Sequence, residues 1–364
     1  MRRRKRLLRM AIRLLPIVLA LILIVALFGF LLKSCGKGKD AKVLITKTLG
    51  KTDVFRIGDE ICTTPEIMVF LTTTQSEYEK VYGKAIWNTS QDGVTLESYV
   101  KEKVLEKAAQ IKSTYLLAKS KGLELTDEEK RFAQAAAKDY CGQIGASQRE
   151  SLGLTEELLQ KLYEEYALAN KAYLSVTSEI NPEISDDEAR IITIEHILIR
   201  TSTRDAEGNR VEFLTAEKNT AYEEATKVRE EAIAGKKSFE DLAARYSEDP
   251  TLTYSFGKGE MDPAIETVAF QMETGEISGV VESESGYHVI KCISTFDEEE
   301  TQENKKKILK ERQDEAFGKE YEAFVETLAK KLNESAWDEV ELIHDGMLPG
   351  ADFFEIYEKF FDEK

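Results

Sequence analysis

The chain has 364 residues, of which 42% are apolar and 9% aromatic, which suffices for ordinary buried cores and excludes an intrinsically disordered protein. Its formal charge is −17 at pH 7, although the first 13 residues contain seven arginines and lysines and no acid. The remainder is strongly acidic. This argues against nucleic acid as a partner, because phosphate binding requires surfaces rich in Lys and Arg.

The basic start, residues 1–13, leads into an uncharged apolar segment, residues 14–32. As a helix this segment would extend over roughly 28 Å, which matches the hydrocarbon thickness of a bilayer. Its length favours a transmembrane anchor over a cleaved signal peptide, whose apolar region is usually shorter. By the positive-inside rule the basic start stays in the cytoplasm, and the body of the chain is extracytoplasmic.

A lipoprotein signal is the second interpretation of this region. The sequence LKSC at residues 32–35 resembles a bacterial lipobox, in which Cys35 would be lipidated and become the first residue, although Lys33 fits such a box poorly. Either interpretation tethers the body to the outer side of the cell membrane. In that compartment Cys62 and Cys141 could form a disulfide or stay as buried thiols, and the sequence leaves both open.

Residues 42–181 are predicted to form a mostly helical module. It opens with two short apolar runs around Gly58, typical of a β-hairpin, followed by a helix with Pro65 at its first position. Apolar residues at helical spacing predict three further helices, which begin at Thr95, Thr126 and Thr155. The Asn181-Pro182 pair then ends the module.

The pattern changes in residues 185–296. In order, this stretch contains a strand (IITIEHILI), a helix from Ala216 to Ala234, two short helices (FEDLAARY and PAIETVAF) and a second strand (GYHVIKCI). Such an order predicts an α+β domain with a small antiparallel sheet and surrounding helices. The first and last strands are expected to be neighbours in that sheet.

Residues 300–345 return to a helical pattern, with an apolar stripe between residues 308 and 332 that needs a partner. The obvious acceptor is the helical module, which this C-terminal helix would complete. The stripe also leaves open a homodimer or another helical partner. Residues 346–364 are predicted to form an acidic tail, and His344 is expected at the surface.

Two of the three histidines, His196 and His288, lie in the two predicted strands and alternate with aliphatic residues. From periodicity alone, two core histidines bonded to backbone groups are the simplest interpretation. A zinc site is disfavoured because no third ligand stands at suitable spacing, and no cofactor is expected. A hydrolase is also disfavoured, because no serine lies in a nucleophile-elbow context.

Residues 191–293 resemble a parvulin-type peptidyl-prolyl cis/trans isomerase domain. The segments that carry the resemblance are, in order, EHILI, SFEDLAARYSED, FGKGEM, AF, GEIS and GYHVI. More loosely, residues 54–180 and 301–345 resemble the chaperone part of membrane-tethered extracytoplasmic foldases related to PrsA and SurA. The resemblance therefore implies an isomerase domain joined to a helical chaperone module.

The resemblance also implies roles for individual residues. Catalytic roles would belong to His196, Asp249, His288, Ser283 and Ser285. The substrate proline would contact Met261, Ile265 and Phe270. Without the resemblance, Asp249 would be a turn residue before Pro250, and the two serines would be turn hydroxyls.

Two departures from the family pattern bear on activity. The usual Gly-Gly-Asp-Leu-Gly loop before FGKGEM is replaced by PTLTYS, and Ile265 stands where an aromatic residue is expected. The primary interpretation is a membrane-anchored isomerase and foldase acting on unfolded or nascent exported polypeptides with X-Pro bonds. The alternative is a holdase chaperone without rate enhancement, and a structural membrane adapter is a weaker third.

Overall fold

The computed structural model describes residues 49–361 apart from residues 92, 345 and 347. The predicted basic start, the apolar segment 14–32 and Cys35 lie outside the described residues. The chain divides into two compact units, the first comprising residues up to 180 together with those from 313 onward, and the second comprising residues 181–312. Within the described part, none of the helices has the length and apolarity needed to cross a bilayer.

The first unit contains a three-stranded antiparallel sheet in the order β11-β1-β2. Its strands are β1 (Asp53–Ile57), β2 (Glu60–Thr63) and β11 (Lys330–Leu332). The predicted hairpin is confirmed, and Gly58 turns it with a φ of 55°, in the left-handed region that favours glycine. Strand β11 comes from the far end of the chain and pairs with β1 at Phe55↔Leu332. The sequence predicted helix there; instead α11 (Glu298–Val325) ends before this strand.

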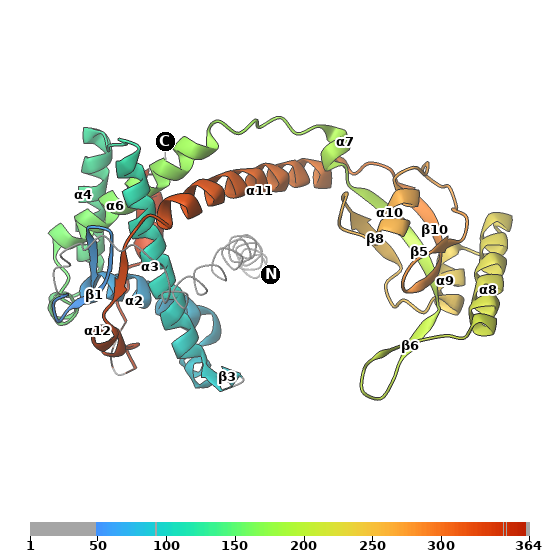
Figure 1. Ribbon diagram of the computed structural model, residues 1–364, viewed down its shortest axis with the longest axis horizontal. Coiled ribbons are helices and arrows are strands. Elements are labelled where there is room, and N and C mark those ends of the chain that lie inside the picture. Colours follow the sequence, from blue (N-terminus) through green and yellow to red (C-terminus); the bar gives the residue numbers. More distant parts are fainter. Residues whose placement is uncertain (1–48, 92, 345, 347, 362–364) are drawn as a thin grey trace, which may run out of the picture. The chain divides into compact units, whose positions relative to one another are not determined.

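Helices make up most of the first unit (Figure 1). Its larger helices are α2 (Thr64–Tyr82), α3 (Leu96–Ser120), α4 (Asp127–Gln143) and α6 (Glu156–Thr177). Its smaller elements are η1 (Lys84–Asn88), β3 (Ser90–Gln91), β4 (Val94–Thr95), α5 (Ala146–Ser151) and α12 (Glu334–Asp338). The three predicted helix starts are confirmed, because Thr95, Thr126 and Thr155 are N-caps whose side chains accept backbone hydrogen bonds.

The expectation of an acidic tail at residues 346–364 is wrong for its central part. Residues Phe353–Phe361 form α13, and Phe353 is completely buried. The rings of Phe353 and Tyr163 stack with centroids 4.3 Å apart. The segment is acidic on average, but its aromatic residues follow helical spacing and supply an apolar face. The same core takes in Phe317 and Tyr321 from α11, the latter through a 2.7 Å hydrogen bond between its hydroxyl and Ser113.

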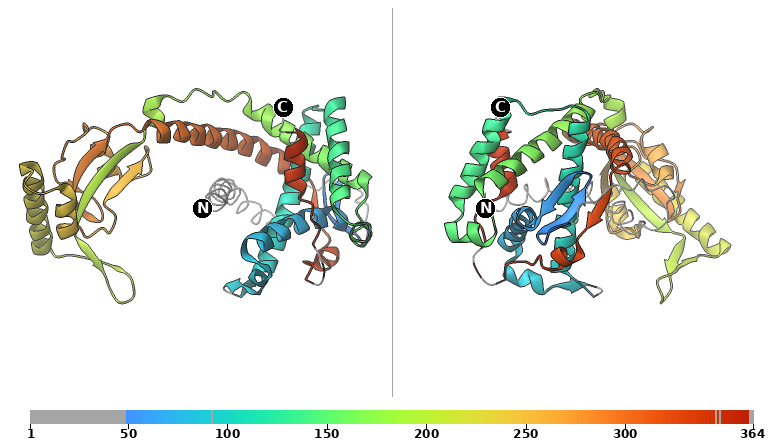
Figure 2. Two further views of the ribbon diagram at one scale, coloured as in Figure 1. Left: turned by 180° about the vertical axis from the view of Figure 1, so that it is seen from behind. Right: turned by 60° about the vertical axis from the view of Figure 1, so that its left-hand side comes forward.

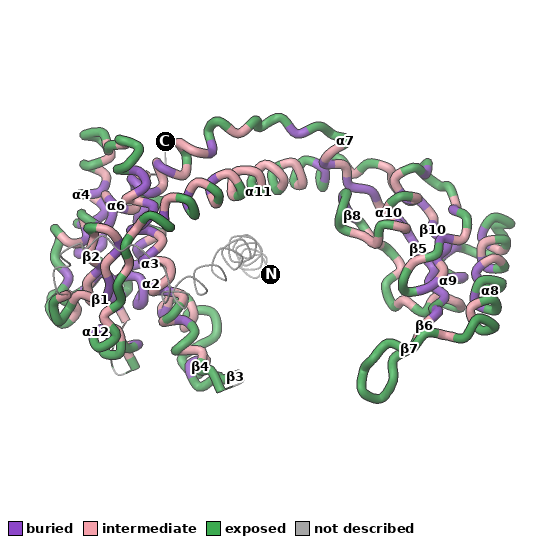
Figure 3. Tube along the Cα trace, viewed as in Figure 1, coloured by how far each residue is buried: buried purple, intermediate pink, exposed green. Residues whose placement is uncertain are grey.

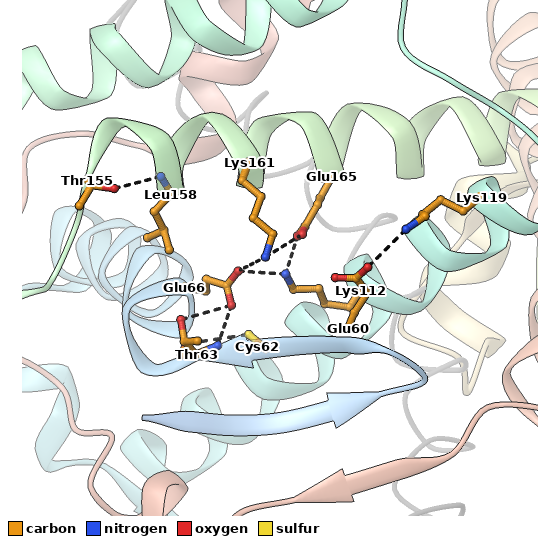
Figure 4. A network of polar contacts seen from close by, with 10 residues as sticks. All are labelled: Glu60, Cys62, Thr63, Glu66, Lys112, Lys119, Thr155, Leu158, Lys161 and Glu165. Carbon is orange, nitrogen blue, oxygen red and sulfur yellow. Dashed lines mark hydrogen bonds and ion pairs between the residues drawn. The ribbon is translucent and has the colours of Figure 1, made fainter. Parts of the chain in front are cut away.

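A buried ion network connects three helices of this unit (Figure 4). The ammonium group of Lys112 on α3 lies 3.0 Å from the carboxylate of Glu66 on α2 and 2.6 Å from that of Glu165 on α6. The three side chains are at most 3% exposed, while Lys161 approaches both carboxylates from the surface. Burial opposes charge on Lys112, but the two carboxylates raise its pKa above the ordinary value.

The second unit is built on a four-stranded antiparallel sheet in the order β8-β5-β10-β9. The strands are β8 (Thr253–Phe256), β5 (Ile192–Arg200), β10 (Gly286–Ser294) and β9 (Val281–Glu282). The expected pairing of the first and last long strands is confirmed as β5 with β10. Most of β5 and much of β10 are buried, as the purple segments of Figure 3 show.

Helices cover both faces of this sheet (Figure 2). On one face α8 (Thr215–Ala234) and α9 (Phe239–Tyr246) pack against Ile197, Ile199 and Val289. On the other face α10 (Pro263–Ala269) packs against Ile192, Ile194 and Ile290. The remaining elements are α7 (Asp186–Ala189) and a hairpin of β6 (Ser202–Arg204) and β7 (Arg210–Glu212). The three described cysteines, Cys62, Cys141 and Cys292, are free and buried.

Candidate functional site

The register of β5 and β10 brings His196 and His288 together. His196 pairs with Ile290, and His288 pairs with Leu198, so the two histidines are diagonal neighbours on one face of the sheet. That face is the one covered by α10. The Nδ1 atoms of the two imidazoles lie 3.2 Å apart, and the rings are inclined by only 16°. Both residues are at most 3% exposed.

Hydrogen-bond partners on either side define the tautomers of the pair. Nε2 of His196 lies 3.2 Å from the carboxylate of Asp249, which can only accept, so this nitrogen carries the proton. In the neutral ring Nδ1 of His196 then accepts, and the donor across the 3.2 Å contact is Nδ1 of His288. Nε2 of His288 is left to accept from the Ser283 hydroxyl, 2.8 Å away.

The result is one directed chain of hydrogen bonds from Ser283 through both histidines to Asp249. At its start the Ser283 oxygen accepts from the Ser285 backbone N–H at 3.1 Å, and the two serine hydroxyls lie 2.9 Å apart. The chain satisfies every ring nitrogen without placing a charge on either buried imidazole. Both serines, expected from the resemblance, are therefore beside the histidines.

Burial keeps both rings neutral near pH 7. It lowers the pKa of His288 to about 4, and the neighbouring His196 adds to the effect. Burial also lowers the pKa of His196, against the opposing influence of the Asp249 carboxylate. The pair therefore acts as a fixed hydrogen-bonding framework at neutral pH.

Asp249 closes the chain from the loop after α9. Its Oδ1 accepts from the Thr251 backbone N–H at 2.8 Å, which is the local turn expected before Pro250. Its Oδ2 accepts from both His196 and the hydroxyl of Tyr254, the latter at 3.1 Å. Burial alone would raise the pKa of Asp249, but the donors from Thr251, Tyr254 and His196 bring it below the ordinary value. Asp249 is therefore both a turn residue and part of the site.

A cavity of about 570 Å³ opens above this chain of hydrogen bonds. Its apolar wall consists of Leu198, Met261 and Ile265, and its floor includes His196, His288, Asp249 and Ser285. Three arginines and two further acidic residues, Asp262 and Glu284, also line it. The combination of a compact apolar wall with a polar floor suits a small apolar ring that is attached to a peptide group.

Phe270, predicted to contact the substrate proline, is not among the residues that line the cavity. It lies at the C-terminal end of α10, whereas Met261 and Ile265 lie at or before the start of that helix. Its ring packs edge-on against Phe256, with centroids 5.9 Å apart, and the guanidinium of Arg190 lies over it. In this structure Phe270 is a partly buried residue that packs against the core beside α10.

Leu198 and Tyr254 are among the cavity residues that sequence reasoning missed. Leu198 follows His196 by two positions, so the same alternation that placed the histidine also places Leu198 on the cavity face. Tyr254 lies in PTLTYS, the segment that replaces the family's glycine-rich loop and that here leads into β8. The alternation of Tyr254 with Phe256 was a signal that this segment is a strand.

Comparisons with known proteins agree with this geometry. Residues 196–294 match the family described as Rotamase, the PPIC-type PPIASE domain. The peptidyl-prolyl cis-trans isomerase Pin1 of Arabidopsis thaliana is 33% identical over 108 residues, which cover 26% of this chain and 89% of that protein. The Foldase protein PrsA of Caldanaerobacter subterraneus subsp. tengcongensis is 26% identical over 315 residues, which cover 82% of this chain and 92% of that protein.

The fold of the second unit and the paired histidines of its site define a parvulin-type peptidyl-prolyl cis/trans isomerase domain, accompanied by a largely helical remainder. The similarity to PrsA extends well beyond that domain. The chain belongs to the family of parvulin-type peptidyl-prolyl cis/trans isomerases, and over most of its length it is similar to a PrsA foldase.

Proposed function

We propose that this protein is anchored in the cell membrane and isomerises X-Pro bonds of unfolded exported polypeptides in the cavity above the His196–His288 pair. The observation that carries the proposal is the 3.2 Å contact between the two Nδ1 atoms at the floor of a cavity walled by Met261 and Ile265. A polar floor in which two neutral imidazoles hold an ionised carboxylate, beneath an apolar wall, suits an amide isomerase.

The reaction breaks no covalent bond. Its barrier of about 18–20 kcal/mol arises because the C–N bond loses its resonance when it twists. A catalyst lowers this barrier by binding the twisted amide more tightly than either planar form. Leu198, Met261 and Ile265 would hold the proline ring in the apolar part of the cavity, away from water.

Asp249 supplies a negative charge at the edge of the cavity. Resonance places partial negative charge on the carbonyl oxygen and gives the C–N bond its double-bond character. A carboxylate next to that oxygen disfavours the resonance form and so favours the twisted amide. The lowered pKa of Asp249 keeps the carboxylate ionised for this role.

The histidines would act by position. Because no proton has to be transferred, neutral imidazoles serve by fixing Asp249 on one side and Ser283 on the other. Substituting His196 would remove one of the donors to the carboxylate, and substituting His288 would remove the acceptor of Ser283 and the donor to His196. Ser285 would assist by holding Ser283 through its backbone N–H.

The helical unit and the N-terminal segment complete the proposal. The length and charge flanks of residues 14–32 support a single membrane-spanning anchor, or lipidation at Cys35, with the body outside the cytoplasm. The helical unit would bind unfolded chains. Exported polypeptides that emerge beside the membrane are the partners that this arrangement suits.

The decisive experiment measures cis/trans exchange of an Ala-Ala-Pro-Phe peptide with the full-length protein. We expect catalysed exchange, and a loss of about tenfold or more in kcat/KM for His288→Ala. The matched control is His344→Ala, which removes an exposed histidine of the first unit, paired there with Glu97, and should leave the rate unchanged. No exchange above background with the unmutated protein, together with suppression of client aggregation, would establish a holdase instead.

A further inference from the structure

We infer that Tyr254 is a further functional residue of the isomerase site, in which its hydroxyl positions Asp249 and its ring forms part of the wall that receives the substrate proline. This inference rests on the proposed function of the cavity. It assigns a role to the segment PTLTYS, which departs from the family pattern and which the histidine chain does not explain.

The first contact is between the tyrosine hydroxyl and the carboxylate. The Tyr254 hydroxyl donates to Oδ2 of Asp249 at 3.1 Å, the same oxygen that accepts from His196. With Oδ1 held by the Thr251 backbone N–H, the carboxylate has donors on both oxygens and cannot rotate without losing one. Tyr254 thereby fixes the group that we place next to the substrate carbonyl.

The second contact is between two rings. The Tyr254 ring meets the His196 ring edge to face, with centroids 5.0 Å apart and planes inclined by 83°. This geometry is favourable for aromatic pairs and restrains the imidazole ring. Tyr254 also lines the cavity, together with Met261 and Ile265.

The position of the Tyr254 ring compensates for the second departure from the family pattern, the replacement of an expected aromatic residue by Ile265. Ile265 provides no aromatic surface where the family is expected to have it, whereas Tyr254 enters the same cavity from β8. The register explains this placement, because Tyr254 pairs with Ile194, and both face the side of the sheet that carries His196. Strand β8, in the segment that replaces the glycine-rich loop, thus provides an aromatic side chain, Tyr254, at the proline site.

Two substitutions in the full-length protein separate the two roles. Tyr254→Phe keeps the ring and removes the hydroxyl. We expect the Kd for an Ala-Ala-Pro-Phe peptide, measured by chemical-shift titration, to stay within about twofold while the exchange rate at saturation falls about three- to tenfold. The carboxyl signal of Asp249 should titrate at higher pH, because the carboxylate has lost a donor.

Tyr254→Leu removes the ring as well, and we expect it to weaken peptide binding about three- to tenfold in addition. The control is Tyr222→Phe with Tyr222→Leu, because Tyr222 lies on α8 and its ring contacts Tyr287 on the opposite face of the sheet. Both control variants should keep the Kd, the exchange rate and the Asp249 titration of the unmutated protein.

Two results would overturn the inference. An unchanged Asp249 titration in Tyr254→Phe would refute the positioning role of the hydroxyl. An unchanged peptide affinity in Tyr254→Leu would refute the role of the ring in the wall of the proline site. Neither readout depends on turnover. If the unmutated protein binds the peptide but does not accelerate exchange, the isomerase proposal fails while the carboxyl titration and the Kd still decide the role of Tyr254.

Discussion

His196 and His288 share one hydrogen bond between their Nδ1 atoms, 3.2 Å apart, although 92 positions separate them in the sequence. The bond requires opposite tautomers in the two rings, and the outer partners decide which ring has which. Asp249 accepts from His196 and Ser283 donates to His288, so the polarity of the whole chain follows from one carboxylate and one hydroxyl.

The tautomers give a spectroscopic prediction. At pH 7 the ¹⁵N spectrum should show His196 protonated only at Nε2 and His288 only at Nδ1. Asp249→Asn should lower the pKa of His196 further, because the carboxylate that opposes the effect of burial is gone. The same tautomer in both rings, or a protonated pair at pH 7, would contradict the directed chain.

The buried histidines should also make stability depend on pH. In the folded protein the pKa values of both histidines lie below the ordinary value near 6.5, and that of His288 falls to about 4. Between pH ~6.5 and ~4 the unfolded state therefore binds more protons than the folded state. Stability from this source is present above pH ~6.5 and is lost as the pH falls toward ~4.

Denaturant unfolding followed by NMR signals of β5 and β10 would measure this effect. His288→Asn should reduce the difference in stability between pH 7 and pH 5, although it lowers stability at pH 7. His344→Asn, which changes an exposed histidine, should preserve the pH dependence. An equal pH dependence in all three proteins would show that His288 contributes nothing to it.

Removal of Lys112 should strongly destabilise the helical unit. Lys112→Met removes the buried cation between Glu66 and Glu165 and leaves the two carboxylates to Lys161 at the surface, a loss that we expect to cost about 3–5 kcal/mol. Both tryptophans of the chain, Trp87 and Trp337, lie in this unit, so their fluorescence reports its unfolding in urea. Lys319→Met, at an exposed pair with Glu315, should change stability by less than about 1 kcal/mol. Similar effects of the two substitutions would refute the importance of the buried network.

Helix α13 should be essential to the first unit. Phe353→Ala removes a completely buried ring that stacks on Tyr163, and we expect a loss of about 3–5 kcal/mol in the free energy of unfolding. Leu174→Ala, at a side chain that is 62% exposed in the same unit, should cost less than about 1 kcal/mol. Tryptophan fluorescence in urea measures the free energy of unfolding of both variants. A minor effect of Phe353→Ala would show that α13 is dispensable for the stability of the unit.

Gly286 should not tolerate a side chain at the start of β10. Its φ of +150° lies outside the range of ordinary L residues, and an added Cβ would lie 2.2 Å from the Ile199 carbonyl oxygen. We expect Gly286→Ala to cost about 3 kcal/mol or more and to lower isomerase activity, because the strand carries His288. Gly279→Ala, where no atom lies within 4 Å of an added Cβ, is the control in unfolding and exchange measurements. Equal stability of the two variants would contradict this reading.

Local patterns in the sequence were enough for much of the fold and part of the site. Threonines at 95, 126 and 155 marked helix starts, because N-capping depends only on a residue and the three after it. Alternation in two β-branched runs put His196 and His288 on defined strand faces. The family resemblance then supplied Asp249, Ser283 and Ser285, all of which the structure brings to the histidines.

Only the tertiary structure decided which distant segments meet. No local signal paired Lys330–Leu332 with β1 or packed α13 beside Tyr163, since both depend on surfaces that form from the whole unit. The same holds for the cavity: Phe270 is apolar and near the expected position, yet at the end of α10 it packs against the core, while β8 turns Tyr254 toward His196. Periodicity determines the face on which a side chain lies, and long-range packing determines what lies opposite that face.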